Sequence, residues 1–134
     1  MLTVNQRFEH VFRVSQEQVN TFAEVTGDKN PLHLDPEYAA KTIFRRPAVH
    51  GAFAIGVFSK IMGMEFPGPG TIYLEHQIQF LKPMYPEVDY KAVVTLVSTV
   101  PDKHQGVFRT EIWQDGSDRQ IVNGEATVFH RTLL

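Results

Sequence analysis

Residues 51–62 read GAFAIGVFSKIM, a run in which Ser59 and Lys60 are the only strongly polar members. A helix that is apolar nearly all round is typical of a protein core. The run is far shorter than the ~20 residues that a membrane-spanning helix needs. Gly63 follows directly and is a natural C-terminal cap. The stretch therefore predicts a long buried helix around which the rest of the chain is arranged.

The sequence on either side predicts what covers this helix. Residues 8–14 alternate between apolar and polar side chains, as a half-buried strand does. Ser15 and Gln18 form a capping box that opens one helix, and an Asp-Pro pair opens a shorter helix over residues 35–42. Turn residues then separate four segments with strand character, at residues 72–81, 87–100, 106–113 and 120–130. We expect a single α+β domain over residues 1–134, with an antiparallel five-stranded sheet wrapped around the long helix.

The composition excludes several classes of protein. The chain has 134 residues, and its 13 Lys and Arg against 15 Asp and Glu give a formal charge of -2, which disfavours nucleic acid as a partner. It has no Cys, so disulfides, thiolate nucleophiles and zinc-thiolate sites are excluded. Residues 1–10 carry no signal-like pattern. We expect a soluble cytoplasmic protein without membrane contact, or an organellar matrix protein if a presequence was removed.

A short polar turn stands out between the two predicted upstream helices. Within the sequence TGDKNPLH, residues 26–33, Asp28, Asn30 and His33 lie close together on a turn stiffened by Pro31. A carboxylate and an imidazole placed in this way can hold one water molecule between them and move its proton. The same residues also suit a purely structural role, in which Asp28 and Asn30 bond turn backbone groups and His33 packs against a helix.

A second feature lies where the long helix begins, at His50 and Gly51. The first N–H groups of a helix have no partner within the helix, and the helix dipole favours negative charge there. Gly51 has no side chain, so a carbonyl oxygen can approach its N–H closely. A proton-transfer pair together with such an oxyanion donor is what addition of water to a conjugated carbonyl requires.

These two motifs together carry a resemblance to a known family. The segment from Thr26 to His33, with Ala39 following, resembles the hydratase motif of the MaoC-like, (R)-specific enoyl-CoA hydratase family, and residues 47–51, PAVHG, are similar to that family's approach to its central helix. The likeness runs from about residue 8 to the C-terminus. It implies a hot-dog fold, a homodimer, and reversible syn hydration of trans-2-enoyl thioesters to (R)-3-hydroxyacyl thioesters, with no metal or redox cofactor.

The resemblance also assigns roles by position. It implies that Asp28 and His33 are the catalytic pair and that Asn30 supports them. It implies that Gly51 is the backbone donor to the thioester oxygen and that Ser59 is a further active-site residue. Beside Gly51, we include His50 among the residues expected to bind substrate. Which member of the catalytic pair is the base and which the acid stays open, because the two pKa values are coupled.

Several alternatives remain at this point. A 3-hydroxyacyl-[acyl carrier protein] dehydratase would use the same site with a different carrier, whereas a non-catalytic acyl-thioester binding module or a thioesterase would use the same scaffold. A metal site made of His33, Asp35 and His50 is disfavoured, because Asp35 is better explained as a helix cap. Arg45 and Arg46 are either a solvated pair or contacts for the phosphates of coenzyme A. The acyl length and the physiological direction do not follow from the sequence.

Overall fold

The computed structural model describes residues 1–134 as one curved sheet packed against one long helix. The strands are β1 (Arg7–Arg13), β2 (Ile72–Phe80), β3 (Asp89–Val100), β4 (Gln105–Gln114) and β5 (Gln120–Phe129). The helices are α1 (Gln16–Thr26), α2 (Pro31–Leu34), α3 (Pro36–Ala40), α4 (Gly51–Met64) and the short 3-10 turn η1 (Pro101–Lys103).

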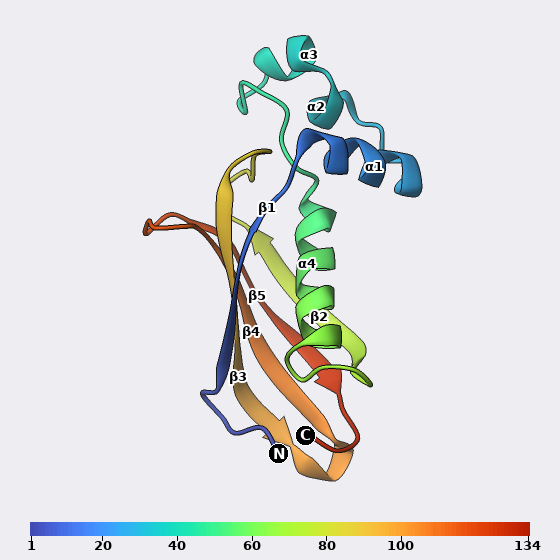
Figure 1. The fold of residues 1–134 in the computed structure, drawn as a ribbon, viewed down its shortest axis with the longest axis vertical. Coiled ribbons are helices and arrows are strands. Elements are labelled where there is room, and N and C mark those ends of the chain that lie inside the picture. Colours follow the sequence, from blue (N-terminus) through green and yellow to red (C-terminus); the bar gives the residue numbers. More distant parts are fainter.

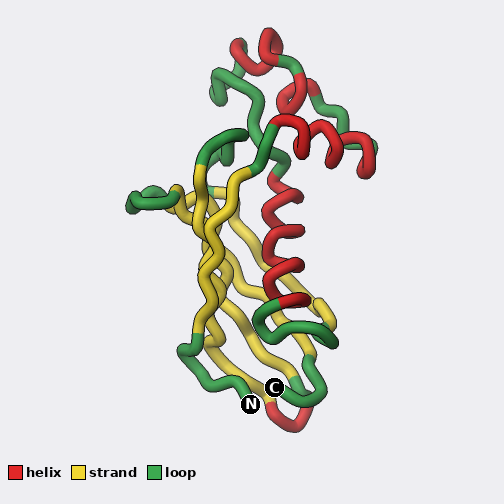
Figure 2. The backbone as a smooth tube through the Cα atoms, in the orientation of Figure 1, coloured by secondary structure: helices red, strands yellow, loops and turns green.

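The sheet is fully antiparallel in its pairings, with the strand order β1-β3-β4-β5-β2. Figure 1 shows α4 running along its concave side, and Figure 2 shows the same arrangement with helices and strands distinguished by colour. The predicted α+β architecture, an antiparallel five-stranded sheet around a long helix, is therefore confirmed.

The core forms between α4 and the inward side chains of the sheet. Phe58, Ile61 and Met62 of α4 are fully buried, as are Leu96 of β3 and Phe108 of β4. They belong to one continuous apolar cluster. The exposed face of α4 comprises Ala52, Gly56, Ser59, Lys60 and Met64. The helix is thus only half covered in a single chain, whereas its composition predicted burial all round.

Two local predictions were wrong. Gly63 does not end α4, which continues to Met64, with the N–H of Glu65 donating to the carbonyl of Ile61. Glycine inside a helix costs about 1 kcal/mol relative to alanine but does not terminate it, and here the chain leaves the helix only at the turn containing Pro67. Residues 31–34, expected to be part of a turn, form the one-turn helix α2, in which Pro31 at the first position supplies a helical φ.

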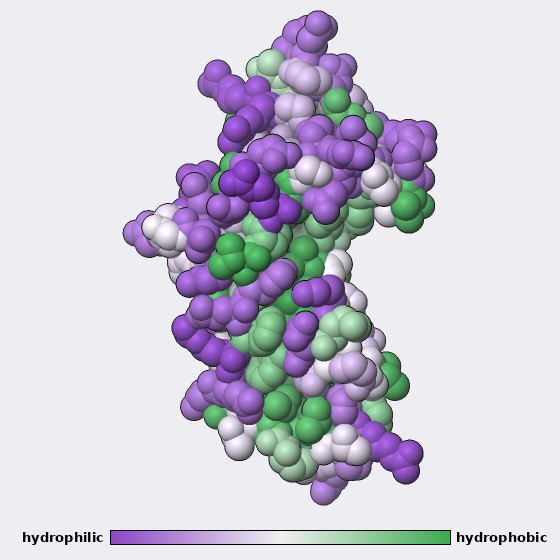
Figure 3. Space-filling view, viewed as in Figure 1, coloured by the Kyte–Doolittle hydropathy of each residue, from purple (hydrophilic) through white to green (hydrophobic).

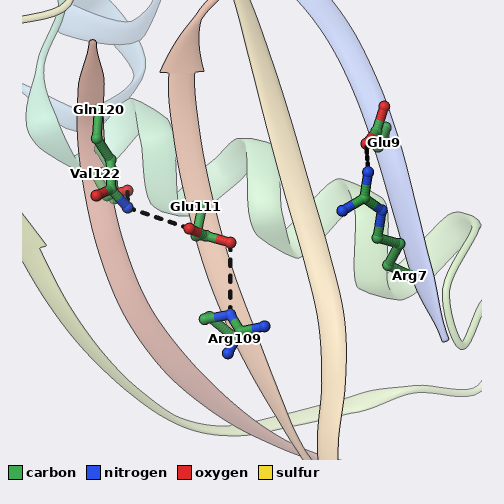
Figure 4. Close-up of polar contacts among 6 residues, drawn as sticks. All are labelled: Arg7, Glu9, Arg109, Glu111, Gln120 and Val122. Carbon is green, nitrogen blue, oxygen red and sulfur yellow. Dashed lines mark hydrogen bonds and ion pairs between the residues drawn. The ribbon is translucent and has the colours of Figure 1, made fainter. Parts of the chain in front are cut away.

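The outer face of the sheet is polar. Figure 4 shows Arg7 with Glu9 on β1, and Glu111 of β4 bridging Arg109 on its own strand and Gln120 on β5. Such exposed pairs contribute little to stability, typically under about 1 kcal/mol each. They lie on the solvent side of the sheet. None of the helices is long and apolar enough to cross a membrane.

Candidate functional site

Helices α1, α2 and α3 form a cap above the N-terminal end of α4 (Figure 1). In Figure 3 the surface of this cap is mostly hydrophilic, and hydrophobic side chains gather below it over the body of the molecule. The residues of the predicted site lie where the cap meets α4.

The capping box predicted for α1 is present. The Ser15 hydroxyl accepts from the N–H of Gln18, and the Gln18 side chain accepts from the N–H of Ser15. At the other end Gly27 has φ 78°, a left-handed conformation that glycine adopts without steric cost, and its N–H donates to the carbonyl of Ala23. This turn directs Asp28 back toward the start of α4.

Asn30 caps α2. Its Oδ1 accepts from the N–H of Leu32 at 3.1 Å, and its own N–H donates to Oδ1 of Asp28 at 3.4 Å. The structural role considered for Asp28 and Asn30 therefore exists alongside any catalytic one. Because Asn30 closes this turn, it fixes the position of Asp28 relative to His33.

His33 is held in one tautomer. Its Nδ1 lies 2.7 Å from the carbonyl oxygen of Ala48, which can only accept, so Nδ1 carries the ring proton and donates it. Nε2 of the neutral ring is then a free lone pair, as a general base requires. Burial lowers the pKa of His33 below the ordinary value of 6.5, with a contribution from His50, while Ala48 and Asp28 act in the opposite direction. The ring is accordingly neutral at pH 7.

His50 lies directly behind His33. Its side chain is 1% exposed, and its ring stacks on that of His33 with the centroids 3.9 Å apart. Nε2 lies 3.0 Å from the carbonyl oxygen of Asp28 and donates to it, and the ring of Phe22 packs 4.7 Å away. The predicted site residues Asp28, His33 and His50 thus meet in space, although His50 is almost completely covered.

The side-chain donor atoms of Asp28, His33 and His50 lie within 4.8 Å of one another, close enough for a cation to be considered. Each imidazole, however, already uses one ring nitrogen on a backbone carbonyl. Asp35, the third member of the metal set considered from the sequence, accepts from the N–H groups of Glu37 and Tyr38 and caps α3. Its predicted role as a cap is confirmed.

A cavity of about 300 Å³ opens beside His33 and Gly51 and is mostly apolar. Its walls come from the cap, from the start of α4, and from strands distant in sequence. Of the predicted site residues, His33, His50 and Gly51 line it; the lining residues not predicted from the sequence are Phe44, Ala48, Val49, Ala54, Phe80, Leu81, Lys82, Pro83, Met84, Ile121 and Val122. As the first residue of α4, Gly51 has no partner for its N–H within the helix. The arrangement can therefore accept a carbonyl oxygen at Gly51 with an apolar chain beside it.

Two sets of predicted residues lie apart from the cavity. Ser59 is exposed on α4 and is not among the cavity residues, so a single chain does not bring it to His33. Arg45 and Arg46 are exposed, and the Arg46 guanidinium lies 4.0 Å from the ring centroid of Tyr85. Lys82 is the one cation that lines the cavity itself.

Comparison with known proteins gives a consistent result. Residues 3–127 match the family model of the MaoC like domain. The chain is 37% identical over 127 residues to the (R)-specific enoyl-CoA hydratase of Aeromonas caviae, an alignment that covers 95% of this chain and 94% of that protein. It is also 31% identical to the mitochondrial 3-hydroxyacyl-[acyl-carrier-protein] dehydratase of Arabidopsis thaliana, over 86% of this chain and 69% of that protein.

Solved structures agree with the sequence comparison. The (R)-hydratase from A. caviae superposes with a TM-score of 0.91 at 36% identity, covering 97% of this chain and 98% of that one. The R-hydratase PhaJ1 from Pseudomonas aeruginosa gives a TM-score of 0.88 at 32% identity, covering 96% of this chain and 82% of that one.

Proposed function

The chain belongs to the MaoC-like domain family and has the hot-dog fold, and we propose that it is an (R)-specific enoyl-CoA hydratase that adds water reversibly to trans-2-enoyl thioesters. One observation carries the proposal most directly. The free Nε2 of a neutral His33 belongs to a ring that lines an apolar cavity together with Gly51, and the carboxylate of Asp28 lies within 4.8 Å of a His33 ring nitrogen.

Each part of the site has one task in this reaction. The Gly51 N–H donates to the thioester oxygen and withdraws electrons from C3 of the substrate. Asp28 and His33 hold a water molecule, whose oxygen bonds to C3 as Nε2 of His33 takes its proton. That proton is then returned to C2 of the enolate, on the same face of the former double bond. The dehydratase direction follows the same steps in reverse.

The cavity suits the acyl part of the substrate. Val49, Ala54, Met84 and Val122 give it apolar walls, so an alkyl chain gains the usual transfer energy of roughly 0.8 kcal/mol per buried CH₂. Lys82 lies on the same cavity and supplies a positive charge for a phosphate-bearing carrier. We therefore place the acyl chain among the apolar walls and the carrier on the Lys82 side.

The plant relative favours a second candidate that differs only in carrier, a 3-hydroxyacyl-[acyl carrier protein] dehydratase. Matched enoyl-CoA and enoyl-[acyl carrier protein] substrates with the same acyl chain separate the two. A higher kcat/KM for the CoA thioester supports the hydratase assignment, and a higher value for the carrier protein thioester supports the dehydratase.

We propose that the working unit is a homodimer. β2 is an edge strand of the sheet, and α4 leaves Ala52, Gly56 and Ser59 exposed beside apolar neighbours. Unpaired strand edges and exposed apolar helix faces favour pairing with another copy. This face carries Ser59, so the dimer gives the predicted role of Ser59 a structural basis.

Loss of enoyl-thioester absorbance, compared with release of free thiol, tests the function and separates hydration from hydrolysis. Asp28→Asn and His33→Gln should each lower kcat by about 10²- to 10⁴-fold, the usual contribution of a proton-transfer group. Asp35→Asn, which keeps a capping side chain, and His10→Gln, outside the cavity, are matched controls expected to stay near normal. Near-normal turnover of both folded site variants would exclude the assignment.

A further inference from the structure

The imidazole ring of His50 has two nitrogen atoms, and only one of them has a hydrogen-bond partner. Nε2 donates to the carbonyl of Asp28, whereas Nδ1 is buried and has no hydrogen-bond partner. His50 is 1% exposed, although it is among the residues that line the cavity. A buried polar atom without a partner destabilises the fold, so this histidine requires an explanation other than stability.

We propose that His50 is a positioning residue, which holds the backbone of Asp28 through Nε2–H and, through its stacked ring, keeps water away from one face of His33. This inference rests on the proposed hydratase function. It assigns His50 a task that acts through the catalytic pair and not on the substrate.

The first half of the proposal follows from the hydrogen bond at Asp28. The carbonyl of Asp28 belongs to an exposed turn between α1 and α2, and its bond to His50 joins this turn to the residue just before α4. Gly51 is the next residue along the chain. The same side chain therefore connects the carboxylate that holds water to the backbone donor that meets the thioester oxygen, and a displacement of about 1 Å between such groups typically lowers turnover ~10²-fold.

The second half follows from the stacking. The His50 ring stacks on His33 at a centroid separation of 3.9 Å, and the ring of Phe22 packs against His50 at 4.7 Å. Water is excluded from that face, which disfavours the protonated imidazole of His33. The charged and titratable groups facing His33 are Asp28 on the turn, His50 before α4, and Lys82 on the cavity wall.

The tautomer of His50 follows from its hydrogen bond to Asp28. Its Nε2 must carry a proton in order to donate to the Asp28 carbonyl, so Nδ1 is a bare lone pair in the neutral ring. Protonation of Nδ1 would place a charge in a buried position that offers no acceptor.

Two variants separate the two halves of the proposal. His50→Gln keeps an amide donor for Asp28 but removes the ring, and His50→Phe keeps a ring but removes the donor. In His50→Gln, water should reach His33 and raise the pKa of the His33 ring. The acid limb of the kcat/KM profile should therefore move to higher pH. With His50→Phe, the acid limb should stay in place while kcat falls at least tenfold and KM changes little.

His104→Gln is the matched control, since His104 also contacts a backbone carbonyl, that of Leu134 at 3.0 Å, far from the cavity. It should leave both kcat and the pH profile unchanged. Folded His50→Gln and His50→Phe variants that both keep the normal kcat and the normal acid limb would overturn the proposal.

A measurement on the unmutated protein covers the case in which these variants do not fold. Imidazole ¹⁵N NMR should show His50 as the Nε2–H tautomer and His33 as the Nδ1–H tautomer. An Nδ1–H tautomer of His50, which could not donate to the Asp28 carbonyl, would contradict the proposal. Because NMR needs no turnover, this result stays separate from any failure of the hydratase assay.

Discussion

The ring of Phe80, at the end of β2, lies against the backbone of Gly51, at the start of α4. A Cβ built on Gly51 would stand 3.0 Å from Cε1 of Phe80, closer than side chains normally pack. The donor proposed for the thioester oxygen therefore sits under an aromatic ring that is 52% exposed and free to shift. A small side chain at position 51 would meet this ring and not the core, so it can test whether the space beside the Gly51 N–H is needed for activity.

Gly51→Ala should lower kcat about tenfold or more while leaving the fold intact. Its methyl group would displace the Phe80 ring and crowd the carbonyl, and small displacements of this kind cost up to ~10²-fold in rate. Steady-state kinetics in a double-mutant cycle with Phe80→Leu checks the cause. The loss should be smaller in the Phe80→Leu background, and an equal loss in both backgrounds would show that Phe80 plays no part.

Gly27→Ala should destabilise the protein by about 1–2 kcal/mol, the usual cost of a left-handed conformation for a residue with a Cβ. Nothing lies within 4 Å of the added methyl, so the strain is confined to the backbone. Gly27→Asn should cost less, because asparagine tolerates this region. Urea unfolding of the two variants checks the order, and equal stabilities would contradict the conformational explanation.

Thermal stability should fall as the pH drops below 6.5. Burial lowers the pKa values of His33, His76 and His10 in the folded protein, so the unfolded chain binds more protons below 6.5. Their neutral forms stabilise the fold fully above that pH, and the contribution is lost as the pH falls toward the lowered values. Calorimetry at pH 7.5 and 5.5 should give the lower Tm at 5.5. A Tm that is unchanged or higher at pH 5.5 would show that these rings are not buried as described.

Gly56→Glu should dissociate the proposed dimer without unfolding the chain. Gly56 is exposed on α4, and no atom of the same chain lies within 4 Å of an added Cβ. Because glutamate has a higher helix propensity than glycine, the substitution should not destabilise α4 in an isolated chain. Light scattering should give about twice the 15.3 kDa chain mass for the unmutated protein and a single-chain mass for the variant. Val25→Glu, on the exposed face of α1, is the control that should remain dimeric. A dimeric Gly56→Glu variant would exclude this face as the interface.

The local signals in the sequence predicted local structure well. The capping box at Ser15 and the cap at Asp35 are interactions within a few residues, so their patterns are visible in the sequence. Gly63 misled the prediction because glycine also occurs inside helices, where only the surrounding fold decides whether the chain turns.

The cavity could not be predicted in the same way. Phe80 and Val122 both line it because they are paired where β2 meets β5, two segments far apart in the chain. Likewise, the burial of His50 depends on Phe22 and His33 packing on its two sides. The sequence contained no local signal of these contacts, because they join segments that are distant in the chain.

The stereochemistry of hydration tests the central claim most directly. With the thioester oxygen at Gly51 and water held by Asp28 and His33 over one face of the double bond, water and proton arrive on the same side. Crotonyl-CoA incubated with the protein should lose its enoyl absorbance and give (R)-3-hydroxybutyryl-CoA, which an (R)-specific dehydrogenase consumes and an (S)-specific one does not. An (S)-product, or release of free thiol with no hydration, would contradict the account.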